Sequence, residues 1–375
     1  MSPPKYLTDR DLIALSDEIR RSRAAVDAPD FFASTKPSNH DGEFEVLRRW
    51  NSHSPMVNFQ FGGAYFLRWN GRGIVIDPGC TFLEVFRQKH GQFVNGNFVP
   101  SVEAHCMDDI DLVVATHDHA DHCEDLAMLL ILLRAYNKWK KDREGKSYRP
   151  HKIDLILSHG VYFRNHTILE HPDNRRLLNI CKVLPRRRVS QKLDHQRIRA
   201  KYKLDVDCIK TRHREIMGDH TGFGLRLKLY GAGKPFTMCD SGDTGFTEEL
   251  AQQYEGAQLL ILHVGTLEEL PKEERGRNEH LCFHGVKNVL DGLKKPPLLV
   301  LLGEWGEEFR IPEARKRFTE AVKRNIEKID RFPILPADLG MRIRLPDCHV
   351  QCDGKFIDPG QVKVEDVGQW LRYYS

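Results

Sequence analysis

The chain has 375 residues, 40% of them hydrophobic and 29% charged, and its formal net charge at pH 7 is only +4. Such values are typical of a globular protein, and they exclude a fibrous or a compositionally disordered chain. The longest uninterrupted apolar run, residues 126–133, is far shorter than the roughly 18 residues that a membrane span requires. We therefore expect no membrane helix and no membrane partner.

The cysteines and the N-terminus both bear on location. The nine cysteines are scattered without a Cys-x-x-Cys pair, and an odd number cannot all pair in disulfides. The first residues lack the apolar core of a secretory signal. We therefore expect a cytoplasmic protein with reduced cysteines, in which Cys123 and Cys282 are packing residues.

Three regions can be separated along the chain. Residues 8–27 have the cap and the apolar spacing of a helix, and residues 33–41 are rich in turn-forming residues. We expect residues 1–45 to be a helical extension and linker, residues 46–345 to be one large domain, and residues 346–375 to be a hairpin and tail. The leading helix could contact a second copy in a homodimer, but simple packing is the preferred interpretation.

The large domain changes its hydrophobic period along its length. From residue 57, apolar stretches are interrupted by Gly62-Gly63 and Asn70-Gly71, which is typical of antiparallel hairpins. Further on, strands and helices alternate in two halves, which is typical of an α/β fold. The expected elements are a strand at 113–115, a helix at 124–140, a strand and turn at 153–160, a strand at 224–230, a helix at 248–254, a strand at 259–263, a helix at 280–293 and a strand at 298–302.

A cluster of metal-ligand residue types follows the strand at 113–115. Residues 116–125 read Thr-His-Asp-His-Ala-Asp-His-Cys-Glu-Asp. In an extended segment His117 and His119 leave on the same face and can converge on one ion. Asp121 and His122 follow at the start of a helical stretch and point at a second ion. The segment therefore predicts two neighbouring metals.

The pattern His117-x-His119-x-Asp121-His122 resembles the signature of the metallo-β-lactamase-fold hydrolases. The remaining positions of that family occur here in the same order, at Asp77, His213, Asp243 and His280. An isolated His213 would more often be an ordinary polar residue, but the complete ordered set favours ligands. The resemblance covers about residues 57–345 and implies an α/β fold, namely a four-layer αββα sandwich.

The resemblance also implies a site with two zinc ions, or with Mn²⁺ or Fe²⁺ in their place. Asp243 would bridge the ions, and Asp77 would orient a ligand histidine. A metal-bound hydroxide would be the nucleophile, because zinc lowers the pKa of bound water to about 7. The implied ligands of one ion are His117, His119 and His213, and those of the other are Asp121, His122 and His280.

Two assignments stay open at this point. His284, one helical turn after His280, competes for the last ligand position, although His280 is favoured. His263 ends a strand and could donate a proton during catalysis, but a position outside the metal shell is equally compatible with the pattern. We take Asp77, Asp121 and His263 as the candidate catalytic residues.

Residues 241–245, Ser-Gly-Asp-Thr-Gly, and the strand before His263 resemble the ribonuclease Z-like branch and related phosphodiesterases. This chain departs from that branch, because Val264 replaces a Glu and Leu281-Cys282 replaces a Ser-Thr pair. Glu304 or Glu307 could supply the missing acid. We therefore expect a binuclear phosphodiesterase or nuclease, but not an authentic transfer-RNA processing enzyme.

A basic block at residues 175–203 contains only one acidic residue, Asp194. Clustered cations attract a polyanionic backbone without reading bases. A solvated surface is an equally weighted alternative. The block predicts a phosphate-containing substrate, such as RNA or single-stranded nucleic acid, and its candidate contacts are Arg186, Arg187, Arg188, Arg197 and Arg199.

The same fold is compatible with three other functions. A lactone or small-ester hydrolase would use the same metals but would need an apolar pocket instead of a basic rim. A non-catalytic binding module is disfavoured by the complete ligand set. A redox protein with a di-iron centre is disfavoured because no flavin domain is visible in the sequence.

Overall fold

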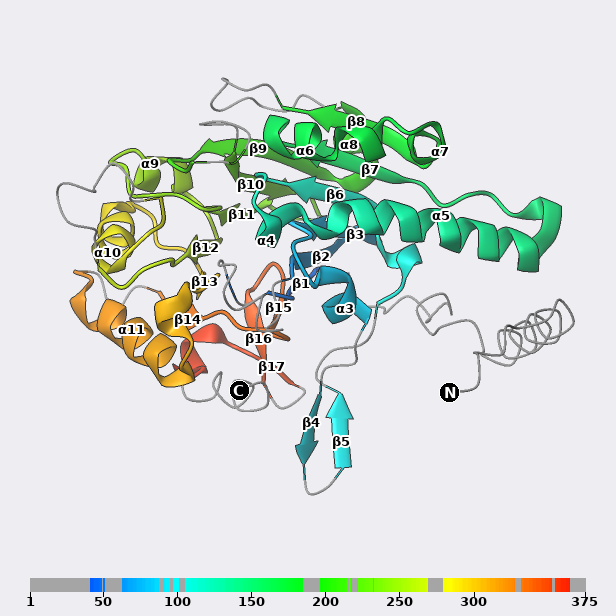
Figure 1. The fold of residues 1–375 in the computed structure, drawn as a ribbon. Helices are drawn as coiled ribbons and strands as arrows, with labels where there is room; N and C mark the ends of the chain where they lie inside the picture. The colour runs from blue at the N-terminus through cyan, green and yellow to red at the C-terminus, as the bar shows by residue number, and fades with distance from the viewer. Residues whose placement is uncertain are drawn as a thin grey trace, which may run out of the picture.

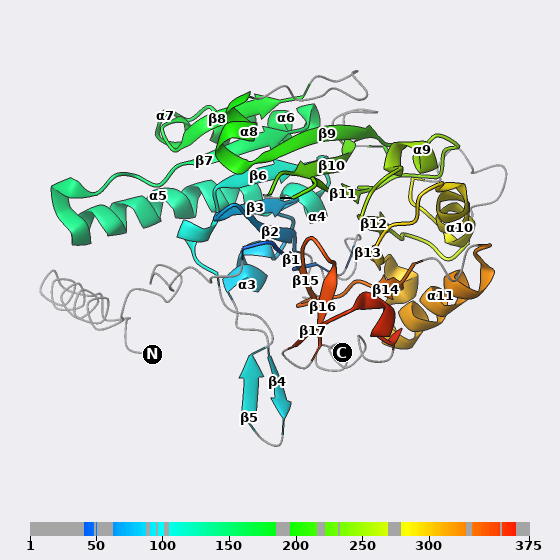
Figure 2. The same ribbon diagram turned by 180° about the vertical axis from the view of Figure 1, so that it is seen from behind.

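The computed structural model describes residues 41–48, 50, 63–87, 91–94, 97–100, 105–184, 196–214, 216, 222–231, 233–268, 279–327, 332–352 and 355–364. Two large sheets lie face to face, and helices cover their outer faces (Figure 1). The view from behind shows the same four layers (Figure 2). The expected leading helix at 8–27 and the arginines at 186–188 lie outside the described residues.

The larger sheet has nine strands in the order β17-β16-β15-β1-β2-β3-β6-β7-β8. Its pairing is antiparallel from β17 to β3 and parallel from β3 to β8. The strands are β1 (Glu43–Val46), β2 (Tyr65–Trp69), β3 (Arg72–Ile76), β6 (Leu112–Ala115), β7 (Ile153–Leu157), β8 (Leu178–Val183), β15 (Arg342–Arg344), β16 (His349–Cys352) and β17 (Lys355–Ile357).

The smaller sheet has six strands in the order β14-β13-β12-β11-β10-β9. Pairing is parallel from β14 to β11 and antiparallel from β11 to β9. A separate two-stranded ribbon, β4 (Gly91–Val94) and β5 (Asn97–Pro100), projects from the body in both views (Figures 1 and 2). The sheet contains β9 (Leu204–Lys210), β10 (Phe223–Leu229), β11 (Phe236–Asp240), β12 (Leu259–His263), β13 (Leu299–Gly303) and β14 (Ile334–Pro336).

Helices pack on the two outer faces. The larger sheet is covered by α3 (Phe82–Arg87), α5 (Asp125–Glu144) and α6 (His159–Leu169), with the short α4 (Ala120–Cys123) and α7 (Pro172–Arg175) beside them. The smaller sheet is covered by α9 (Leu250–Tyr254), α10 (Phe283–Gly292) and α11 (Pro312–Asn325). One further helix, α8 (Gln196–Tyr202), precedes β9. Among the described residues, no helix is both long and apolar enough to cross a membrane.

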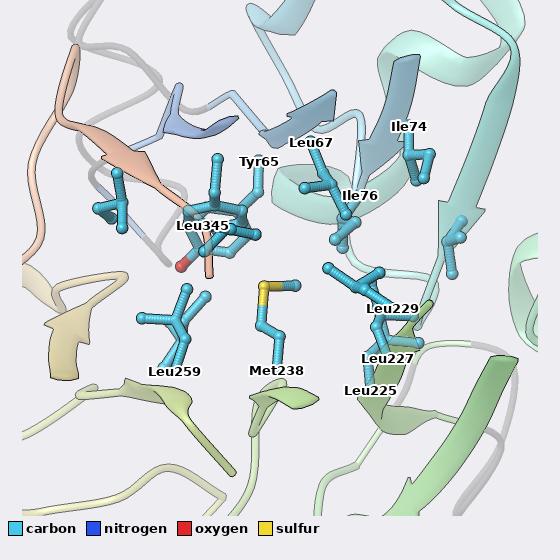
Figure 3. Close-up of a cluster of buried hydrophobic side chains, with 14 of the residues drawn as sticks. Tyr65, Leu67, Ile74, Ile76, Leu225, Leu227, Leu229, Met238, Leu259 and Leu345 are labelled. Atoms are coloured by element: carbon cyan, nitrogen blue, oxygen red, sulfur yellow. The ribbon is translucent and has the colours of Figure 1, made fainter. Parts of the chain in front are cut away.

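Three apolar layers follow from this arrangement. Because neighbouring side chains of a strand point to opposite faces, Tyr65 and Leu67 of β2 enter the layer between the sheets, whereas Phe66 packs under the helices. Figure 3 shows the layer between the sheets, where side chains of β2 and β3 meet those of β10, β11 and β12. On α5, Leu126, Leu130 and Leu133 recur at helical spacing and seal the outer layer.

The α/β class and the sandwich agree with the sequence analysis, and most predicted elements are present within a few residues. The turn Asn70-Gly71 has positive φ at both residues, 53° and 66°, which suits the tight turn between β2 and β3. The large sheet extends past both expected boundaries of the main domain. β1 begins at residue 43, and β16 and β17, the expected C-terminal hairpin, continue the same sheet.

The carboxyl ends of parallel strands in both sheets point to one region. β3, β6, β12 and β13 all end there, and the residue that directly follows each of them is buried. The loop after β3 is pressed against α4, because a Cβ atom at Gly79 would lie only 1.7 Å from the backbone oxygen of Asp121. Only glycine fits this contact.

We predict that Gly79→Ala lowers the free energy of unfolding by about 1–3 kcal/mol, the usual cost of overpacking a tight contact. Chemical denaturation of the purified chain measures this change. Gly233→Ala is the matched control, since nothing lies within 4 Å of an added Cβ there. If the two variants are equally stable, the loop after β3 can move to make room for the added Cβ atom.

Candidate metal centre

The predicted metal motif lies where β6 is followed by α4. His117 and His119 project from the extended loop, since His119, the residue before the helix, has φ −69° and ψ 151°. Asp121 and His122 stand in the short helix itself. The change from extended chain to helix therefore brings four side chains to one place.

A first group of ligand atoms contains three imidazoles and one carboxylate. His117, His119, His213 and Asp243 offer ligand atoms that all lie within 4.8 Å of one another. His119 Nδ1 is 2.9 Å from His213 Nε2, and His117 Nε2 is 3.5 Å from Asp243 Oδ2. His213 follows β9, so this group joins residues from both sheets.

A second group contains one imidazole and three carboxylates. Asp121, His122, Asp243 and Glu304 again have ligand atoms within 4.8 Å of one another. His122 Nε2 is 3.4 Å from Asp121 Oδ2 and 3.5 Å from Asp243 Oδ2. Asp243 belongs to both groups, as expected of a bridging ligand.

The distances and the donor set fit two metal ions. Ligand atoms about 2.1 Å from a tetrahedral ion lie about 3.4 Å from one another, which matches the spacings at Asp243 and His122. His117 Nε2, Asp121 Oδ2 and Asp243 Oδ2 are buried and make no hydrogen bond to any described residue. Leaving such atoms without a partner is costly, and a cation between them would satisfy all three.

Asp77 holds one of these imidazoles in place. Its Oδ2 lies 2.8 Å from His122 Nδ1, while Thr116 donates to both carboxylate oxygens from its backbone N–H and its hydroxyl. A third close group of potential ligands, Asp77, His117 and His122, is explained by these hydrogen bonds. The carboxylate directs His122 Nε2 towards the centre, which is how outer groups orient metal-binding histidines.

Burial and neighbouring charge set the protonation states. Burial, with the charge of His122, holds the pKa of His117 well below its usual value, and burial also lowers the pKa of His119 and of His213. Burial alone would raise the pKa of Asp243, but His280 and His122 hold it well below its usual range. Neutral imidazoles and an ionised carboxylate are the forms that bind metal.

The structure distinguishes between the two candidate ligand histidines near α10. His280 was expected to begin this helix, but the helix begins at Phe283, because Leu281 first forms a β-bridge with Val264. His280 Nδ1 is 3.7 Å from Asp243 Oδ2. His284 is exposed and contacts the ring of Phe283. The structure therefore brings only the first of the two to the centre.

A family model described as a beta-lactamase superfamily domain matches residues 72–301, which is more than half of the chain. The chain belongs to the beta-lactamase superfamily. The match begins at β3 and ends in β13, so it includes the motif at His117 as well as Asp243 and His280.

The similarity to individual members of the superfamily is more limited. Ribonuclease Z from Chlamydia trachomatis is 29% identical over 118 residues, which are 30% of this chain and 33% of that protein. The matched region thus spans about a third of that relative's length. YhfI from Bacillus subtilis superposes with a TM-score of 0.54 at 14% identity, covering 80% of this chain and 98% of that one. The short form of human tRNase Z gives 0.50 at 14% identity, covering 81% and 99%. The predicted fold and the resemblance to the ribonuclease Z-like branch are confirmed.

The side chain of His263, at the end of β12, is fully buried. Its Nε2 is 2.8 Å from Asp240 Oδ1, and its Nδ1 is 3.1 Å from Asp243 Oδ1 and close to Glu304. Although burial would lower its pKa, the carboxylates of Glu304 and Asp240 raise the pKa of His263 well above its usual value. The histidine thus holds the outer oxygen of Asp243 and leaves Oδ2 to the metal groups.

Two residues of the centre were not assigned to it by the sequence. Arg48, fully buried, donates from Nη2 to the backbone oxygen of Asp121 at 2.9 Å and forms an ion pair with Glu304. Its position after β1 carries no local signal of a site. Glu304 was considered only as a substitute acid, although a carboxylate directly after an apolar strand is the same signal that identified Asp77.

Of the five candidate substrate contacts, the structure describes only Arg197 and Arg199, and these two are not at the centre. Arg199 is bound to Asp205, at 2.6 Å from Nε to Oδ1, and Arg197 is exposed on the same helix, α8. Asp205 lies at the start of β9, whereas His213 follows the end of that strand. These two arginines therefore lie at the far end of β9 from the metal groups.

We predict that His280→Ala weakens metal binding by at least about tenfold, because the ring faces the bridging oxygen of Asp243, whereas His284→Ala leaves it unchanged. Competition with a chromophoric chelator measures both affinities. His284 serves as the matched control on the exposed face of α10. The reverse order of effects would assign the ligand position to His284.

Proposed function

We propose that this chain is a binuclear metal-dependent phosphodiesterase, either a nuclease or a nucleotide phosphodiesterase. The observation that carries the proposal is the position of Asp243, whose Oδ2 faces His117 at 3.5 Å and His122 at 3.5 Å and so belongs to both ligand groups. A pair of neighbouring ions suits in-line displacement at phosphorus, since both the attacking and the leaving oxygen need charge stabilisation. The relatives named ribonuclease Z support this class of substrate.

The metals proposed are two zinc ions, with Mn²⁺ or Fe²⁺ as alternatives. Bound metal ions supply Lewis acidity at the phosphoryl group and lower the pKa of a coordinated water. His117, His119, His213 and Asp243 would hold one ion. Asp121, His122 and Asp243 would hold the other, with His280 on the open side.

The residues around the ions act by position. Asp77 fixes the ring of His122 through the 2.8 Å contact to Nδ1. His263 binds Oδ1 of Asp243 and thereby turns Oδ2 towards both groups. The proposal thus treats Asp77 and His263 as positioning residues, and Asp121 as a ligand.

Two positions at which this chain departs from the ribonuclease Z-like branch are buried, which argues against transfer RNA as the substrate. Val264 and Leu281 are fully buried and form a β-bridge with each other, so neither position can present a proton donor to a substrate. Glu307 begins a short 3-10 turn, Glu307–Phe309, and is exposed. We therefore propose a phosphodiester substrate without naming a particular RNA.

Turnover by metal-analysed protein tests the proposal. We expect about two metal equivalents per chain and hydrolysis of a chromogenic phosphodiester, single-stranded RNA or a cyclic nucleotide. Asp121→Ala and Asp243→Ala should each abolish turnover, because each removes a ligand, while circular dichroism stays unchanged. Asp347→Ala, on the exposed loop before β16, is the control. Turnover confined to a lactone or an uncharged ester would replace the proposal with a small-ester hydrolase.

We also predict that the basic block contributes phosphate contacts. Each contact adds about 0.7–0.9 to the slope of log affinity against log salt concentration. A triple variant, Arg186/Arg187/Arg188→Ser, should therefore bind single-stranded RNA with a slope lower by about one to three units, while kcat is little changed. A salt titration of binding gives the slope.

The double variant Arg197/Arg199→Ser provides the control for this titration, because those side chains lie at the far end of β9. Its slope should equal that of the wild type. If the triple variant also keeps the wild-type slope, the block at residues 186–188 is a solvated surface.

A further inference from the structure

Glu304 lies in the metal centre, although the sequence analysis did not predict it as a metal ligand. It directly follows β13, its side chain is fully buried, and its backbone has φ 53°. A non-glycine residue with positive φ is uncommon, and Asp77, whose carboxylate contacts Nδ1 of His122, likewise has φ 54°. Hydrogen bonds from Val264 N to Gly303 O and from Gly306 N to Val264 O fix the chain on either side. The fold therefore forces this carboxylate inward.

The carboxylate of Glu304 points into the second ligand group. Its Oε1 lies 2.7 Å from His122 Nε2, the atom that Asp77 directs to the centre. Oε1 of Glu304, Oδ2 of Asp121 and Oδ2 of Asp243 are all buried. Oε1 of Glu304 forms an ion pair with Nη2 of Arg48, whereas the two aspartate oxygens make no hydrogen bond to a described residue. One guanidinium beside three carboxylates leaves negative charge uncompensated, and a metal ion would balance it, because buried carboxylates are stable only when they are paired or bind a metal.

The second oxygen of Glu304 is occupied differently. Oε2 contacts Nδ1 of His263, whereas Oε1 faces Nε2 of His122 and forms an ion pair with Nη2 of Arg48. Carboxylates that bind metals usually receive such contacts from outer groups, which fix their orientation. Oε2 is therefore held by His263, while Oε1 faces the ligand group with the guanidinium of Arg48 beside it.

We propose that Glu304 is a direct ligand of the second metal ion, together with Asp121, His122 and Asp243. This inference rests on the metal centre proposed above, but not on its substrate. The two sites then differ in chemistry, since the first group offers three imidazoles and the second offers three carboxylates. Imidazole ligands suit zinc, whereas carboxylate ligands suit harder ions such as Mn²⁺ or Mg²⁺. The second site thus prefers the harder ion.

A structural role for Glu304 is the alternative. In that case the carboxylate would only neutralise Arg48, which is buried beside it. Removing Arg48 would then disturb the centre as much as removing Glu304. A ligand role predicts a different result, because Arg48→Met leaves all four ligand side chains in the second group.

The experiment compares metal binding by the full-length chain and three variants, Glu304→Gln, Arg48→Met and the control Glu307→Gln. Elemental analysis after loading with Zn²⁺ and Mn²⁺ gives the stoichiometry, and chelator competition gives the affinities. We expect two equivalents for the wild type and for Glu307→Gln. Glu304→Gln should keep one tightly bound ion and lose at least about tenfold in Mn²⁺ affinity. Arg48→Met should retain more of that affinity than Glu304→Gln.

The absorption spectrum of the cobalt-substituted chain gives a second readout, because it reports the ligands of the ion. Circular dichroism checks that each variant is folded. If Glu304→Gln does not fold, Glu304→Asp replaces it, since this variant keeps the charge beside Arg48 but withdraws the carboxylate by one methylene. A ligand role predicts a changed cobalt spectrum and weaker Mn²⁺ binding for Glu304→Asp.

The outcomes separate this inference from the proposed function. A wild-type chain that binds no metal overturns the metal centre itself. A wild type and a Glu304→Gln variant that both bind two ions with equal affinity overturn only the assignment of Glu304. Equal losses in Arg48→Met and Glu304→Gln, or a Glu304→Asp variant with wild-type spectrum and affinity, assign Glu304 to pairing with Arg48.

Discussion

The centre depends on one buried carboxylate that joins the two halves of the fold. Asp243 follows β11 of the smaller sheet, whereas His117 and His122 follow β6 of the larger sheet, and their nitrogens lie 3.5 Å from the same oxygen. The distance between the two sheets therefore sets the distance between the ligands that each sheet contributes. The apolar layer between them, with side chains such as Leu67 and Met238, sets that spacing (Figure 3). Close-packed interiors resist such changes of distance, so the core supports the geometry of the site.

The buried charges of the centre follow from the same constraint. Carboxylates from both sheets are buried beside one another, which would be unfavourable without positive partners. Arg48 supplies one permanent positive charge. Burial would lower the pKa of His122, but Glu304 raises it well above its usual value, so a proton there supplies another positive charge. A metal ion at the second group would take over this role and displace the proton from His122.

Much of this arrangement could be predicted from local sequence. The strands predicted at 113–115 and 259–263 agree with β6 and β12 within a residue, because each is an apolar run with clear ends. The motif at His117 identifies its loop by itself, since four ligand types occur within six positions. Asp77 could be predicted because a carboxylate directly after a buried strand is seldom present without a role in a site.

The parts that could not be predicted depend on contacts between distant segments. β1 pairs with β15, for example Glu43 with Arg344, and no local pattern announces such a pairing. Arg48 follows β1 and reaches the centre because β1 lies between β15 and β2 in the larger sheet. The start of α10 was expected at His280, but the bridge between Val264 and Leu281 delays it to Phe283. Long-range geometry, and not propensity, decided each of these cases.

The bridge between Val264 and Leu281 also bears on the chemistry that the centre can perform. It joins the residue after His263 to the residue after His280, so the backbone beside two histidines of the centre is fixed by one bridge. Both side chains are fully buried in an apolar cluster, where an unpaired polar group would be costly. Within the proposed function, protonation of a leaving oxygen then has no donor at these two positions. General-acid catalysis contributes most when the leaving group is poor, so its loss matters least for a leaving group that departs readily without a proton. Within the proposed function, we therefore expect the chain to act best on phosphodiesters with acidic leaving groups.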